Sequence, residues 1–107
     1  MWLFLESFPI WVLTNGKAEN LLEMSEEEFL VLDELYFLVS FEEMQSNLEM
    51  DIPEVVKVLE KLLQKKWLRC YNHQGEQLDD ESINLKLSYA NYHYLATKAG
   101  LKAHNQS

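Results

Sequence analysis

The sequence predicts a mainly helical α+β domain with a three-helix core, a two-stranded hairpin and a short last helix. Three observations predict it. Apolar residues recur at helical spacing between residues 26 and 66, and three helix-start signals divide this region. After residue 66 the spacing changes to that of a strand. The chain has 107 residues with only 3 Gly and 2 Pro, which favours one domain of long regular elements.

Residues 1–24 are expected to form an apolar arm ahead of the domain itself, which comprises residues 25–107. The arm is not expected to be a signal peptide or a membrane span, because it lacks a basic start and because Glu6 and Pro9 interrupt its apolar run. Its aromatic residues would either pack on the core or bind a second copy of the chain. The candidates for dimerisation are Trp2, Phe4, Phe8 and Trp11.

The first helix is expected at about residues 26–39. Ser25 and Glu28 form a capping box, in which each side chain accepts a hydrogen bond from the backbone N–H of the other residue. Apolar side chains then follow one helix face, and these are Phe29, Leu32, Tyr36 and Val39. The closing letters, LYFLV, are apolar on nearly every side, which is typical of the central helix in a small bundle.

Two further helices follow with caps of their own. Ser40 is expected to cap a short helix at residues 41–48, and Asp51 is expected to cap a longer one at residues 52–66. Pro53 falls in the first turn of the longer helix, where its missing N–H has no partner to lose. The longer helix is amphipathic, and its inward residues are Ile52, Val55, Val56, Leu59, Leu62 and Leu63.

A hairpin and a last helix complete the predicted domain. Residues 67–71 are rich in aromatic and aliphatic side chains and predict a strand. Residues 72–82 predict a polar loop with Gly75 available for the turn. Residues 83–89 alternate apolar and polar side chains, which predicts a second, half-buried strand. Thr97 is expected to cap the short last helix.

Charge is distributed unevenly along the chain. The formal net charge is −9, and such a charge repels polyanions in general. Residues 18–56 contain twelve acidic residues and no Lys or Arg, residues 57–73 form a short basic band, and residues 74–82 are acidic again. The single cysteine, Cys70, excludes an internal disulfide and favours a reducing, cytoplasmic setting. Its place in the first strand predicts a small buried core residue.

The order of these elements resembles that of the winged helix-turn-helix domains in small bacterial transcription regulators of the MarR type. The segments that carry the resemblance are SFEEMQSNLEMDIPEVVKVLEKLLQKKWLRC and YLATKAGL, and it extends over residues 25–104. It implies a winged-helix fold, regulation of transcription, a homodimer, and binding of duplex DNA through the helix at residues 52–66.

Two features depart from that family. Lys66 stands at a helix-to-strand corner where glycine is usual, which predicts either a different corner or about 1 kcal/mol of backbone strain. The hairpin carries acidic residues where the family usually carries Arg or Lys, and these are Glu76, Asp79, Asp80 and Glu81. The hairpin therefore offers no basic residue for the minor groove.

The resemblance makes the basic residues of the third helix and first strand the candidates for DNA contact, and these are Lys57, Lys61, Lys65 and Arg69. The lysines are four residues apart and are expected to share one helix face. There they would either contact phosphates or form an ordinary solvated surface. Asp51 and Glu54 stand where a recognition helix enters the major groove, but the start of the helix accounts for both.

The sequence contains no arrangement that is typical of catalysis, metal binding or a cofactor site. His73, His93 and His104 lie far apart, and none has a partner at metal-ligand spacing. No paired nucleophile and base, Gly-rich phosphate loop or pair of catalytic carboxylates can be named. An enzyme, a metal site and a cofactor are therefore not expected.

Two functions stay open at this point. The first is a transcription-regulator-like winged helix that binds duplex DNA as a homodimer, and the resemblance favours it. The second is an acidic winged-helix module that binds a protein partner or itself without DNA, and the charge favours it. Duplex DNA is thus a partner that the fold implies and the net charge of −9 opposes. No membrane partner is expected.

Overall fold

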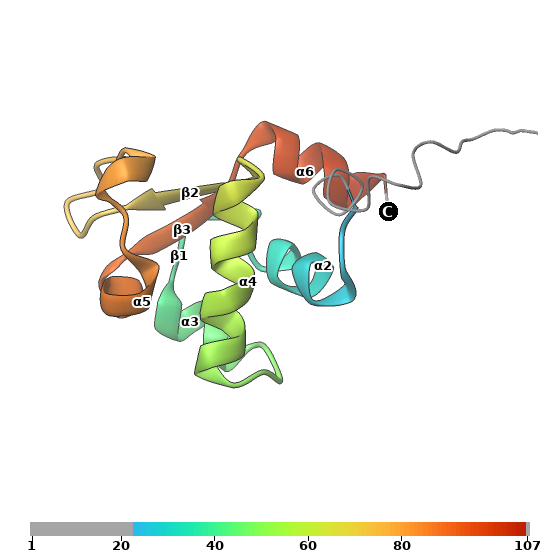
Figure 1. The fold of residues 1–107 in the computed structure, drawn as a ribbon, viewed down its shortest axis with the longest axis horizontal. Helices are drawn as coiled ribbons and strands as arrows, with labels where there is room; N and C mark the ends of the chain where they lie inside the picture. The colour runs from blue at the N-terminus through green and yellow to red at the C-terminus, as the bar shows by residue number, and fades with distance from the viewer. Residues whose placement is uncertain (1–22, 107) are drawn as a thin grey trace, which may run out of the picture.

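The computed structural model describes residues 23–106, which form helices and short strands. In chain order they are α2 (Glu26–Asp33), β1 (Val39–Ser40), α3 (Phe41–Ser46), α4 (Ile52–Gln64), β2 (Leu68–Tyr71), η2 (Asp80–Ser82), α5 (Leu85–Ser88), η3 (Tyr89–Asn91), β3 (His93–Ala96) and α6 (Lys98–Asn105). The predicted fold class is confirmed, because three core helices pack with a small sheet and a last helix (Figure 1). The proposed dimerisation residues of the arm lie outside the described residues.

The sheet is antiparallel with β3 at its centre and the strand order β1-β3-β2. Tyr94 of β3 lies opposite Val39 on one side and opposite Cys70 on the other. Successive side chains of a strand point to opposite faces. One face of the sheet therefore carries the buried residues Leu68, Cys70, Tyr94 and Ala96, and the other face carries Arg69, Tyr71, His93 and Leu95.

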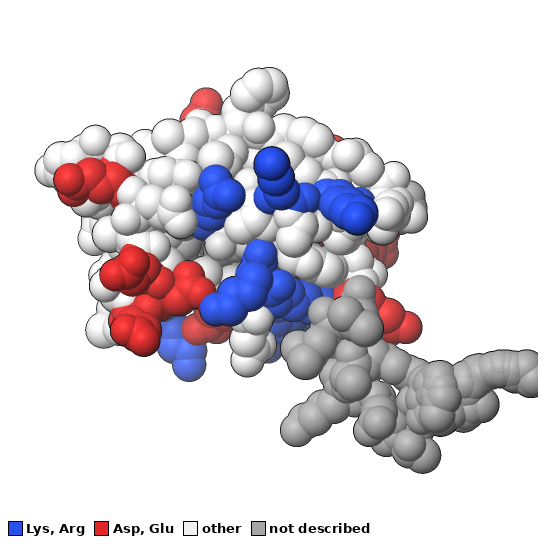
Figure 2. Space-filling view, turned by 90° about the horizontal axis from the view of Figure 1, so that it is seen from above, with Lys and Arg blue, Asp and Glu red and all other residues white. Residues whose placement is uncertain are grey.

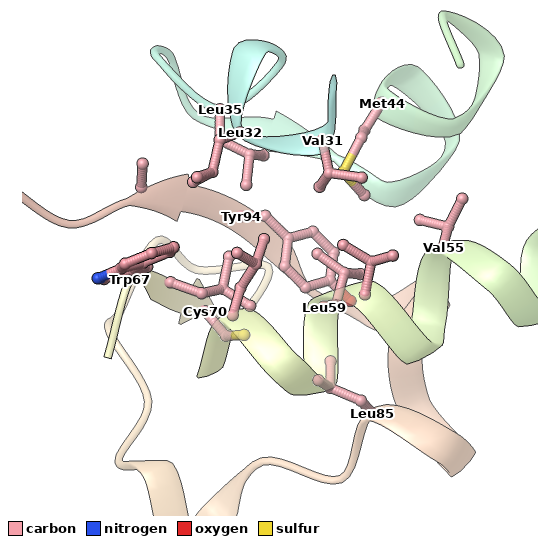
Figure 3. Packing of buried hydrophobic residues seen from close by; sticks show 14 of the residues in the cluster. Val31, Leu32, Leu35, Met44, Val55, Leu59, Trp67, Cys70, Leu85 and Tyr94 are labelled. Atoms are coloured by element: carbon pink, nitrogen blue, oxygen red, sulfur yellow. The ribbon is translucent and has the colours of Figure 1, made fainter. Parts of the chain in front are cut away.

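Tyr94 is at the centre of the core. Its side chain is fully buried, and side chains from α2 and α4 lie on either side of it (Figure 3). The residues that meet there include Val31, Leu32, Leu35, Met44, Val55 and Leu59. The Tyr94 hydroxyl donates to the Tyr89 carbonyl oxygen at 2.6 Å, so its polar atom has a partner inside the core. This tyrosine joins the sheet to the helices with no buried polar group left unsatisfied on its ring.

Each of the longer helices begins at a polar cap residue. Ser25, Ser40 and Thr97 each accept a hydrogen bond from the backbone N–H three residues later, at 3.1 Å. At the start of α4 the reciprocal bond is present, because Asp51 N donates to Glu54 Oε1 at 3.2 Å. These bonds divide residues 26–64 into three helices and fix where each one starts.

The predicted helix at residues 26–39 is wrong in its second half. α2 ends at Asp33, and Val39–Ser40 form the edge strand β1. Leu35 is fully buried and its carbonyl oxygen accepts from Ala96 N at 3.0 Å, which ties the chain to the sheet instead of continuing the helix. Phe37 is left 79% exposed, so the apolar run is not the buried helix that its composition indicated.

The predicted strand at residues 83–89 is also wrong, because the chain forms the helix α5 there and the second hairpin strand is His93–Ala96. The Asn84 side chain accepts from Leu87 N at 3.2 Å and starts this helix. Leu85 is buried whereas Leu87 is 80% exposed, although strand alternation would have placed both on one face. The connection between β2 and β3 is therefore a folded segment that packs on α4.

Lys66 forms the corner between α4 and β2 in a left-handed backbone conformation, with φ of 67°. Trp67 N donates to Leu62 O at 2.9 Å and Lys66 N donates to Leu63 O at 3.0 Å, which is the hydrogen-bond pattern of a Schellman motif. Of the two predicted alternatives, the structure therefore has the family's corner with a strained lysine in the glycine position, at a cost of about 1 kcal/mol.

Candidate nucleic-acid interface

The outward face of α4 is the surface that a recognition helix would present. The helix buries Val55, Val58, Leu59 and Leu62 against the core. The opposite side carries exposed residues about one turn apart, and these are Pro53, Lys57, Lys61 and Gln64. Two lysines therefore stand at the middle of a solvent-facing stripe, held there by the packing of the other side of the same helix.

A cavity of about 590 Å³ lies beside the C-terminal half of α4. Its basic lining consists of Lys57, Lys61 and Lys66, and its acidic lining consists of Glu60 and Asp80. Lys66 was not among the predicted contact residues. The left-handed corner brings it to this cavity, where Lys66 Nζ lies 2.6 Å from Asp80 Oδ2. Positive and negative side chains thus border the same hollow.

The N-terminal half of α4 has a different surface. Asp51 and Glu54 are both exposed there. A second cavity of about 380 Å³ lies between this half of α4 and α5, with Ile52, Pro53, Val56 and Tyr89 among its lining residues. Ile52 is 41% exposed, and Leu87, which follows the lining residue Lys86 in α5, is 80% exposed. The end of α4 that would enter a groove first is therefore acidic and partly apolar.

Lys65 does not lie on the outward face with Lys57 and Lys61. Its side chain is only 7% exposed, and its Nζ lies 2.8 Å from Oε1 of the buried Glu28. The same ammonium lies 4.8 Å from the centre of the Trp67 ring, a cation–π distance. Lys65 therefore joins α4 to α2 inside the domain, and its charge is neutralised there.

Arg69 is also separated from the two exposed lysines. It lies on β2 between Leu68 and Cys70, which both point into the core. Its side chain therefore points to the other face of the sheet, away from α4. The structure thus brings together Lys57 and Lys61 of the predicted contact residues, adds Lys66, and places Lys65 and Arg69 elsewhere.

Cys70 and His104 have surroundings that are typical of structural residues. Burial raises the pKa of the Cys70 thiol to about 12, with a smaller contribution from Asp80, so the thiol stays protonated at neutral pH. His104 stacks on Phe29 with ring centroids 4.1 Å apart, and its Nδ1 lies 2.7 Å from the Tyr36 hydroxyl. Within residues 23–106, no cluster of three or more His, Cys, Asp or Glu side chains could hold a metal ion.

No helix in the described part of the chain combines the length and the apolar character that are needed to cross a bilayer.

The helix, corner and sheet geometry together define a winged-helix fold. No protein-family model and no curated protein sequence matches the chain. A solved structure titled "Multiple Antibiotic Resistance Repressor, MarR" is similar, with a TM-score of 0.59 and 20% sequence identity over 97% of this chain and 75% of that chain. The likeness confirms the predicted resemblance at the level of the MarR-like winged-helix fold, and at this identity it extends to the fold alone.

Proposed function

We propose that the chain is a transcription-regulator-like protein that binds duplex DNA through the outward face of α4. The observation that carries the proposal is the pair Lys57 and Lys61, which are exposed one turn apart on that face. Within the described residues neither lysine forms an ion pair, so both ammonium groups are free to bind phosphate oxygens. The repressor with a similar fold supports the same function by analogy.

The acidic start of α4 limits this binding without excluding it. Glu54 Oε1 already accepts from Asp51 N, so part of the acidic charge serves the helix cap. Neutralising two phosphates releases few counterions, so we expect weak binding with a shallow salt dependence, a slope of about −2 in log affinity against log salt. A homodimer would place two α4 helices on successive half-sites and raise the affinity.

The DNA proposal is tested by reversing the two exposed charges of α4. We expect the wild-type chain to bind a labelled mixed-sequence duplex at about 50 mM salt, and the Lys57→Glu/Lys61→Glu variant to bind at least about tenfold more weakly. The slope of log affinity against log salt should become shallower by about 2, because two phosphate contacts are lost. Fluorescence anisotropy over a range of salt concentrations measures both quantities.

The matched control is Lys98→Glu/Lys102→Glu. These lysines are also exposed and four residues apart, but they lie on α6. Both double variants change the net charge equally, so a general effect of charge would lower their affinity for DNA equally. Equal losses, or a wild-type chain that binds no duplex at about 50 mM salt, would contradict DNA binding through α4.

A second candidate function is protein binding at the cavity between α4 and α5. The observation that favours it is Ile52, which lines this cavity and is 41% exposed, together with Leu87 of α5, which follows the lining residue Lys86 and is 80% exposed. Exposed apolar side chains next to a hollow are typical of protein-binding surfaces. A partner here would cover the N-terminal half of α4, so this function and DNA reading exclude each other on the same molecule.

Self-association is the form of this second function that can be measured directly. We expect Leu87→Asp to lower the solution mass of the full chain towards that of a monomer, because burying the new carboxylate would be unfavourable. Phe37→Asp is the control, since Phe37 is 79% exposed but belongs to the segment before β1. Sedimentation velocity measures the mass, and an unchanged mass for Leu87→Asp would exclude a dimer through this cavity.

A further inference from the structure

The segment between β2 and β3 folds back along α4 and carries acidic side chains to its basic face. Leu85 of this segment is 4% exposed and packs in the core, and α5 contacts α4. Asn84 N donates to the Tyr92 hydroxyl oxygen at 3.0 Å. This bond joins the residue before α5 to the residue after η3. The acidic turn η2 is therefore held in place by the packing of the residues that follow it.

Asp80 of η2 contacts Lys66, the corner residue that follows α4. Its Oδ2 is 2.6 Å from Lys66 Nζ, and it lines the same 590 Å³ cavity as Lys57 and Lys61. Glu81 follows it in the turn and is also exposed. Figure 2 views the molecule from above and shows Asp and Glu side chains next to part of a group of Lys and Arg side chains. The Asp80 carboxylate thus occupies the position at Lys66 that a phosphate oxygen would take.

The backbone conformation of Lys66 is a second observation about this contact. Its φ of 67° favours glycine, so a lysine at this corner is strained. Unlike glycine, lysine provides a side chain. This side chain contacts Asp80 while 73% of its own surface stays exposed. A strained residue whose charged group meets an acidic turn is more typical of a functional contact than of a stabilising one, since an exposed ion pair stabilises a fold very little.

We infer that the acidic turn η2 is an internal phosphate mimic, which competes with DNA for Lys66 at the end of α4 and so weakens DNA binding. The inference rests on the proposed DNA-binding function. Because the turn belongs to the same chain, its effective concentration beside Lys66 is high and does not fall on dilution. Neutralising Asp80 and Glu81 removes the competitor, and DNA then meets Lys66 as a third uncompensated lysine beside Lys57 and Lys61.

The test compares two variants that lose the same charge. Asp80→Asn/Glu81→Gln neutralises the turn, and Glu42→Gln/Glu43→Gln neutralises two exposed acids of α3 that line neither cavity beside α4. Duplex affinity of the full chain is measured by anisotropy at about 50 mM salt. The turn variant is expected to bind about fivefold more tightly than the α3 variant, with a steeper salt dependence.

The outcomes distinguish the competition by η2 from the DNA-binding function on which it rests. If the wild-type chain binds and the turn variant binds more tightly than the α3 variant, competition by η2 is supported. If the wild-type chain binds and both variants have the same affinity, the mimic is excluded while DNA binding stands. If the wild-type chain and both variants all fail to bind duplex DNA, the DNA-binding function itself is excluded and the mimic with it.

Discussion

Replacing Lys65 with alanine is expected to lower the free energy of unfolding by about 4 kcal/mol. The reason is that the variant would leave the buried carboxylate of Glu28 without the lysine that pairs with it. Glu28 is 2% exposed, and its Oε1 accepts from both Lys65 Nζ and Ser25 N at 2.8 Å. Among residues 23–106 its Oε2 has no hydrogen-bond partner, and Lys65 is the cation that pairs with this buried carboxylate. Urea denaturation followed by circular dichroism measures the loss.

Two further variants isolate the cause of this loss. Glu28→Gln/Lys65→Met removes both charges while keeping an acceptor for Ser25 N, and it should recover most of the stability. Lys66→Ala breaks the neighbouring exposed ion pair, in which the side chains are 73% and 48% exposed, and should change stability by less than about 1 kcal/mol. If Lys65→Ala costs no more than Lys66→Ala, the ion pair with Glu28 is not a buried structural contact.

Replacing Gly100 with alanine is expected to destabilise the domain by about 3 kcal/mol. A Cβ at this position of α6 would lie 2.6 Å from the Trp67 carbonyl oxygen and 3.0 Å from the Trp67 Cβ. The neighbour is backbone, so it cannot rotate away, and α6 would have to move off the sheet. Alanine is the better helix former by about 1 kcal/mol, which offsets only part of this cost. Thermal unfolding of the variant measures the net effect.

Gly75 provides the control for this prediction. It has φ of 83°, and a Cβ there would meet nothing within 4 Å. Gly75→Ala should therefore cost only the backbone strain, about 1 kcal/mol. If Gly100→Ala is no more destabilising than Gly75→Ala, the close approach of α6 to Trp67 does not constrain the fold.

Local signals predicted the helix starts and the third helix, because a cap is a contact between residues three apart. Ser25, Ser40 and Thr97 are recognisable without knowledge of the rest of the chain. The end of α2 and the place of the second hairpin strand depend instead on partners far away in sequence. Val39 pairs with Tyr94, and that pairing decides that residues 34–40 leave the helix. No local pattern contains that information.

The same distinction explains the partial success at the candidate site. Lys57 and Lys61 were predicted on one face from their spacing of four residues, and both are exposed on the outward face of α4. Each step of four residues turns about 40° beyond a full circle, so Lys65 has turned about 80° away from Lys57. That rotation brings it to α2 and Glu28. Lys66 reached the cavity through a left-handed corner, which the helical period does not describe.

The sheet described above offers very little free edge to another chain. On one side, β1 is only two residues long. On the other side, the outer edge of β2 is partly occupied, because Leu78 N donates to Cys70 O at 2.9 Å and Tyr71 bridges to Gln77. Exposed strand edges are the usual templates for fibril growth and for capture of extended peptides. Over residues 23–106, this domain is therefore protected against amyloid-like stacking, and its contacts with other molecules fall to its helices.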